Sequence, residues 1–142
     1  MGVILDTCIW VDVERGRMAP GDVAAVTGAE AVFLTPVTIA ELKYGVRRAR
    51  TPAERTRRAA ALARIVRKPC LLIDGTTGEL FGEIAASLDR AGHVARHRVQ
   101  DLWIAALAIQ HNFRLLTRNE RDFADIPGLS LLSLPPPSPT HA

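Results

Sequence analysis

Four acidic side chains that lie far apart in the sequence fall at corresponding places beside predicted strands. Asp6 directly follows the first apolar run of the chain, and Glu41 lies in the first turns of the helix after the second run. Asp101 opens the most apolar helix, and Asp122 comes just after the strand to which that helix leads. Because ligands of open α/β sheets bind outside the carboxyl ends of the strands, we expect the four carboxylates to converge on one edge of a sheet.

Each of these acids also has an ordinary structural explanation. Glu41 completes the pattern of a capping box with Thr38, and Asp101 suits the N-terminus of its helix, either as the cap or as a charge near the positive end. Asp6 could simply end a strand, and Asp122 could cap a turn. Together, however, two carboxylates about 4 Å apart repel by about 4 kcal/mol at an effective dielectric constant of about 20. A cation or altered protonation relieves such repulsion, and an all-oxygen ligand set suits Mg²⁺ or Mn²⁺.

Short apolar runs alternate along the chain with segments of helical periodicity. This pattern predicts an α/β fold, with a short central parallel sheet flanked by helices on both faces. Residues 1–134 form one predicted domain, and the proline-rich segment 135–142 is predicted to be disordered. The predicted strands are residues 3–5, 32–34, 70–73, 115–117 and 131–132, and helical periodicity covers residues 39–49, 62–66, 80–88 and 102–109. Asp74, after the third predicted strand, is expected only to begin a turn, so we leave it out of the site.

The charge of the chain is carried mostly by arginine and favours a phosphate-rich partner. Lysine and arginine total 18 against 15 acids, and the segment 47–68 holds nine basic residues and one acid. Arginine grips phosphate through two parallel hydrogen bonds, although a solvated helix face would show the same composition. The first apolar run stops at Asp6, so no signal peptide is expected, and no apolar stretch approaches the roughly 20 residues of a membrane helix. We therefore expect a cytoplasmic protein.

Four segments in this order resemble the PIN domain, and most closely the VapC toxins of VapBC toxin–antitoxin pairs. They are LDTCIW at 5–10, TIAELKYG at 38–45, QDLWIAA at 100–106 and LLTRNERDF at 115–123. The resemblance implies a PIN-like fold and an endoribonuclease that depends on Mg²⁺, with Mn²⁺ as a possible substitute. It also implies an RNA substrate, a VapB-like antitoxin that covers the acidic site, and a homodimer.

The resemblance assigns roles to individual residues. Asp6, Glu41 and Asp101 match the first three acids of the family, with Asp6 and Asp101 holding the principal metal and Glu41 acting as general base or as a ligand through water. In many members the fourth acid directly follows Thr-Arg, where this chain has Asn119. Asp122 would then supply the fourth charge, or only one metal would bind firmly.

Polar and basic neighbours complete the predicted site. Thr117 and Asn119 could hydrogen-bond water or phosphate, although polar turn residues are equally common after a strand. Arg118, with Arg47 and Arg48 of the basic segment, is a candidate for contact with RNA.

Two other functions are compatible with parts of the pattern. A phosphatase with an aspartyl nucleophile would carry a second aspartate two residues after Asp6, but Cys8 stands there. We treat Cys8 as a neighbour of the site that takes no part in it. A catalytically degenerate domain that binds RNA or a protein partner is favoured only by Asn119 in place of an acid.

Overall fold

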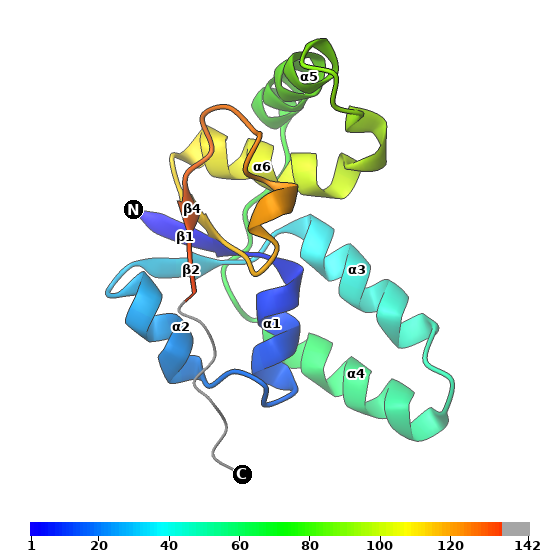
Figure 1. Cartoon of the computed structure of the whole chain (residues 1–142). Helices are drawn as coiled ribbons and strands as arrows, with labels where there is room; N and C mark the ends of the chain where they lie inside the picture. Colours follow the sequence, from blue (N-terminus) through cyan, green and yellow to red (C-terminus); the bar gives the residue numbers. More distant parts are fainter. Residues whose placement is uncertain (135–142) are drawn as a thin grey trace.

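A parallel sheet of four short strands forms the centre of the computed structural model, which describes residues 1–134 (Figure 1). The strand order is β2-β1-β3-β4, and every neighbouring pair is parallel. The predicted parallel sheet is therefore confirmed, and the predicted disordered segment 135–142 lies outside the described residues. The strands are β1 Gly2–Leu5, β2 Ala31–Phe33, β3 Arg114–Leu116 and β4 Leu131–Leu132.

In the part of the chain that the structure describes, six α-helices surround the sheet, together with two short 3₁₀ helices. The periodicity predicts the four longer α-helices but not α1 and α2, which have eight residues each and are too short for a repeated pattern to stand out. Within the described residues no helix is long and apolar enough to cross a membrane. The helices are α1 Thr7–Glu14, α2 Pro20–Thr27, α3 Pro36–Arg47, α4 Pro52–Ile65, α5 Gly75–Arg90, η1 Ala95–His97, α6 Val99–His111 and η2 Glu120–Asp122.

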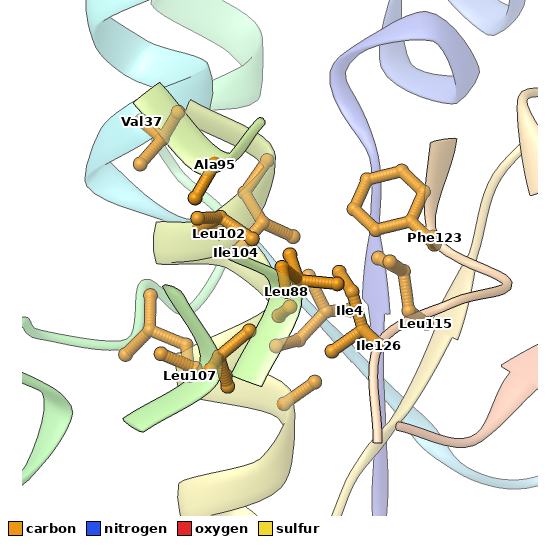
Figure 2. Close-up of a cluster of buried hydrophobic side chains, with 14 residues drawn as sticks. Ile4, Val37, Leu88, Ala95, Leu102, Ile104, Leu107, Leu115, Phe123 and Ile126 are labelled. Atoms are coloured by element: carbon orange, nitrogen blue, oxygen red, sulfur yellow. The ribbon is translucent and has the colours of Figure 1, made fainter. Parts of the chain in front are cut away.

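The alternation of side chains along β1 creates a hydrophobic core on each face of the sheet. Val3 and Leu5 point into one core with residues of α1 and α2, whereas Ile4 points into the other with α5 and α6. Figure 2 shows the second core, in which Ile4 and Leu115 of the sheet face Leu102. Helices thus cover both faces, as predicted.

Helix α6 is the most buried helix of the protein. Residues 104–108 are each 1% exposed or less, in agreement with the apolar run in the sequence. Its three buried alanines carry small side chains, which lets the helix approach β1 and β3 closely. The N-terminus of α6 is thereby held in a fixed position relative to the sheet.

The predicted strand at residues 70–73 is wrong. Cys70 makes one isolated bridge to Leu34, supported by the backbone bonds from Leu34 N to Pro69 O and from Leu71 N to Leu34 O. Beyond it Leu72 is 74% exposed. The apolar run is interrupted because the chain turns away from the sheet edge toward Asp74, whose side chain caps α5.

Candidate active site

Asp6 is the fixed point of the candidate site. It follows β1 and caps α1, and its Oδ1 accepts a hydrogen bond from the Thr7 backbone N–H at 2.8 Å. Its Oδ2 accepts a second bond from the Thr117 hydroxyl at 2.7 Å, and its own N–H donates to the Leu116 carbonyl. The chain leaves β1 toward β2 on one side and returns to β3 on the other, so Asp6 lies at the topological switch point where ligands of α/β sheets bind.

Glu41 lies on α3, beside α1. The N-cap of α3 is Thr35, so the capping box of Thr38 with Glu41 that the sequence allowed is not formed. The Thr38 hydroxyl instead lies 2.9 Å from the Thr7 hydroxyl and ties α3 to the start of α1. Burial raises the pKa of the half-buried Glu41 carboxyl, and the charges of Asp6 and Asp101 raise it further.

Asp101 lies in the first turn of α6 and is the most strongly perturbed acid of the site. The residue at the N-cap position is Arg98, so Asp101 itself does not cap the helix. Burial raises the pKa of Asp101 to about 6, with smaller contributions from the charges of Asp6 and Asp122, while Arg98 acts in the opposite direction. The charges of Asp6 and Asp101 thus act on Glu41, and the charge of Asp6 acts on Asp101, while the metal site that the sequence predicts for these acids stays a prediction.

Asp122 ends η2 and is held near α6 by Arg98. The Arg98 guanidinium bonds both carboxylate oxygens of Asp125 at 2.7 Å and also donates to the Asp122 carbonyl. His93 Nδ1 lies 2.8 Å from the same Asp125 carboxylate. The Asp122 carboxylate is exposed and affects the pKa of Asp101. Nothing in the sequence marked Arg98 for this role, because its partner lies 27 residues away.

The polar residues after β3 have different surroundings. Thr117 is buried, and besides donating to Asp6 it accepts the Asn119 backbone N–H at 3.0 Å. Asn119 is exposed at the rim of the site. Cys8 Sγ lies 3.6 Å from Asp6 Oδ2, and burial raises the pKa of this thiol. Thr117 thus orients Asp6, and Cys8 lies beside the site as expected.

The three arginines proposed for RNA contact are not gathered in one place. Arg118 follows Thr117 directly and pairs with Asp12 of α1 at 2.7 Å. Arg47 and Arg48 lie at the far end of α3, where Arg48 is paired with Tyr44. At 1.5 Å rise per residue they are roughly 10 Å further along the helix than Glu41. Only Arg118 adjoins the acids.

The donor atoms of the site suit a hard divalent cation. Among residues 1–134 no three His, Cys, Asp or Glu side chains are gathered tightly enough to form a metal site by themselves. Mg²⁺ nevertheless retains several waters and is commonly held by one or two carboxylates plus substrate phosphate. Burial and, to a smaller extent, the charges of neighbouring acids raise the pKa values of Glu41 and Asp101, and a cation would offset that negative charge. Asp6 and Asp101 are the residues that would hold it.

Comparison with known proteins identifies relatives over nearly the whole chain. The model of the PIN domain family matches residues 3–129. Ribonuclease VapC5 of Mycobacterium tuberculosis is 31% identical over 131 residues, covering 92% of each protein. The crystal structure of VapBC-5 from that organism, a member of the VapBC family of toxin–antitoxin systems, matches with 29% identity and a TM-score of 0.71, covering 94% of this chain and 98% of that chain. The crystal structure of VapBC2 from Rickettsia felis, bound to a DNA fragment from their promoter, has a TM-score of 0.80 at 23% identity and the same coverage, a likeness of fold.

Proposed function

The chain belongs to the PIN domain family, and from this premise we propose that it is the ribonuclease toxin of a toxin–antitoxin pair. It hydrolyses RNA phosphodiester bonds with Mg²⁺, for which Mn²⁺ can substitute, and it acts in the cytoplasm. The observation that carries the proposal is the match to the PIN domain family over residues 3–129, which includes Asp6 at the carboxyl end of β1, Glu41 and Asp101. Family membership argues against the phosphatase alternative, which would also carry an aspartate where Cys8 stands.

Each residue of the site has a separate role in the proposed hydrolysis. The divalent cation, when bound, supplies an acidified water and offsets the charge of the phosphate. Asp6 is held by Thr7 and Thr117, so both of its oxygens are oriented before any ligand arrives. Glu41, whose raised pKa makes it a better proton acceptor than an exposed glutamate, takes the proton of the attacking water. Asp122 adds negative charge at the open side of the site.

A hollow beside Glu41 supports the proposal of an antitoxin partner. It has a volume of about 490 Å³, lies between α1, α3 and α4, and reaches Glu41. Its walls combine apolar side chains such as Leu42 and Leu62 with arginines such as Arg15 and Arg57. A segment of an antitoxin seated there would cover the acidic site, and a homodimer of the toxin completes the proposed assembly.

The deciding experiment compares the purified protein with an Asp101→Asn variant on structured RNA. The wild type should cut RNA with Mg²⁺ and lose this activity in EDTA. The variant should retain less than about a hundredth of the activity, because it lacks a charge that would hold the cation. Cleavage products resolved on a denaturing gel give the measurement.

Two controls separate the proposal from its alternative. Asp89→Asn changes an aspartate of α5 outside the site and should leave cutting intact, because the asparagine Oδ1 can still accept the Ala95 N–H. RNA binding without cutting by the wild type, at any divalent cation tested, would favour the degenerate binding domain over the nuclease.

A further inference from the structure

Asp12 is a buried carboxylate that the proposed catalytic chemistry does not use. It lies on α1 and is 3% exposed, and its Oδ1 has no hydrogen-bond partner. Burial of a charged group with an unsatisfied oxygen costs free energy. Such a cost indicates a role that an apolar residue could not perform. Its remaining interactions are ion pairs with Arg118 Nε at 2.7 Å and, more distantly, with Arg17 Nε at 3.6 Å.

The pair between Asp12 and Arg118 is the second of two anchors on consecutive residues. Thr117 is bonded to Asp6 at the start of α1, and Arg118 is paired with Asp12 almost two turns further along the same helix. The segment after β3 is therefore fixed to α1 at two points. The pair with Asp12 is made through Nε, so it does not use the two Nη groups of Arg118.

A large hollow is lined in part by Arg118. Its volume is about 1010 Å³, and it extends from Thr117 and Asp122 at the acidic site past Asp12 to α2. Two other acids on its wall have local partners: Asp22 accepts the Ala19 N–H, and Glu120 accepts the Ser133 hydroxyl. The arginines of the hollow are Arg17, Arg118 and Arg121.

We propose that this hollow contains a phosphate subsite for the RNA strand, in which Arg118 binds a backbone phosphate and Asp12 is the residue that positions it. The inference rests on the proposed ribonuclease function. An arginine held through Nε presents its Nη groups as a fixed fork, which matches two phosphate oxygens. The subsite is next to Asp122, so a strand that enters the acidic site would continue across it.

The substitution Asp12→Asn distinguishes two possible effects of Asp12 on RNA binding, its negative charge and its positioning of Arg118. Asp12→Asn removes a negative charge from the hollow, so general electrostatic attraction would make RNA binding tighter. If Asp12 positions Arg118, the same substitution releases the guanidinium and makes binding weaker.

The experiment measures binding of a fluorescently labelled single-stranded RNA by anisotropy, in an Asp101→Asn parent that does not cut. Arg118→Gln should raise the Kd about tenfold and lower the slope of log Kd against log salt by about 0.7, the loss of one phosphate contact to a single strand. Asp12→Asn should raise the Kd by a similar factor. The double variant should be no weaker than Arg118→Gln, because both changes remove the same interaction.

Arg118→Lys and Arg121→Lys form a matched pair in the same hollow. Both keep the charge, but a lysine at 118 lacks the planar fork that holds Asp12 through one nitrogen and offers two others to phosphate, so only Arg118→Lys should bind almost as weakly as Arg118→Gln. This pair decides the question if circular dichroism shows that Asp12→Asn does not fold.

The subsite is overturned if Arg118→Lys binds like its parent, if Asp12→Asn binds as tightly as its parent or tighter, or if Arg118→Gln leaves the salt slope unchanged. A wild-type protein that neither binds nor cuts RNA overturns the proposed function as well. Cutting by the wild type with unchanged binding by the folded Asp12 variant overturns the subsite alone.

Discussion

At the scale of single residues, the partly buried acids of the candidate site reduce the stability of the fold. Asp101 carries the clearest sign of this, since burial and two neighbouring charges raise its pKa to about 6. A carboxyl whose pKa is raised by folding binds its proton more tightly in the folded state. Its charged form therefore destabilises the folded protein above that pKa.

The first prediction concerns the pH dependence of this cost. In metal-free buffer, Asp101→Asn should increase the free energy of unfolding at pH 7.5 by on the order of 1 kcal/mol, after allowance for solvent screening of a half-exposed group. The gain should shrink as the pH falls through 6 and be mostly lost at pH 4, where the folded wild type carries the proton too. Urea denaturation at both pH values gives the measurement.

The control for this prediction is Glu83→Gln on the exposed face of α5, which should change stability little at either pH. Equal stability of wild type and Asp101→Asn at pH 7.5 would contradict the assignment of Asp101 as a strained acid.

At the scale of elements, the position of Asp122 depends on a clamp between α6 and the segment that follows η2. Arg98, one residue before α6, binds both oxygens of Asp125 and the Asp122 carbonyl, and its side chain is only 20% exposed. Burial and the fixed geometry of a two-bond arginine pair make this contact stronger than an open surface ion pair. The clamp keeps the last acid of the site beside Asp101.

Arg98→Gln should therefore affect both stability and cation binding. We expect the free energy of unfolding to fall by about 1–3 kcal/mol, because Asp125 loses a charged partner. The Mg²⁺ concentration for half-maximal RNA cutting should rise several-fold, because Asp122 is no longer held in place. Thermal melts and a magnesium titration measure the two effects.

Two further variants test whether geometry or charge is responsible. Arg98→Lys keeps the positive charge near Asp101 but loses the planar fork, so it should recover only part of the cation affinity. Arg96→Gln alters an exposed arginine of η1 and should leave both quantities unchanged. Full recovery by Arg98→Lys would show that charge is sufficient.

At the scale of the whole molecule, the α3–α4 hairpin extends away from the sheet and forms one wall of the hollow that reaches Glu41 (Figure 1). Thr51 caps α4 and Pro52 begins it, which fixes the turn between the two helices. Within the hairpin, Arg58 of α4 donates to the Gly45 carbonyl of α3 at 2.7 Å. A second contact joins the hairpin to α1, where Arg64 pairs with Glu14. These contacts tie the two helices of the hairpin to each other and to α1.

The prediction at this scale separates antitoxin binding from RNA cutting. Leu62→Lys places a charge on the apolar wall of the hollow and should weaken inhibition by the antitoxin at least tenfold while the protein still cuts RNA. Inhibition curves with purified antitoxin provide the measurement. Leu72→Lys, at an exposed leucine outside the hollow, is the matched control and should be inhibited like the wild type. Equal inhibition of both variants would exclude the hollow as the antitoxin site.

The sequence by itself determined the α/β class and the approximate positions of all four strands of the sheet, and it selected the candidate acids. Strands such as residues 3–5 can be predicted from the sequence because a strand covered on both faces is apolar throughout. Asp6, Glu41 and Asp101 could be selected because each stands beside the end of such an element, and parallel strands bring those ends to one edge. These properties are local or follow from rules of topology.

The tertiary structure alone decided which side chains are partners. The apolar run 70–73 has strand composition, but whether it pairs depends on how far the chain follows the edge of the sheet. The pair of Arg98 with Asp125 joins residues 27 positions apart, and the pair of Arg118 with Asp12 joins residues 106 positions apart. Charged side chains have many possible partners in a sequence, and only packing of the backbone brings one within hydrogen-bond reach.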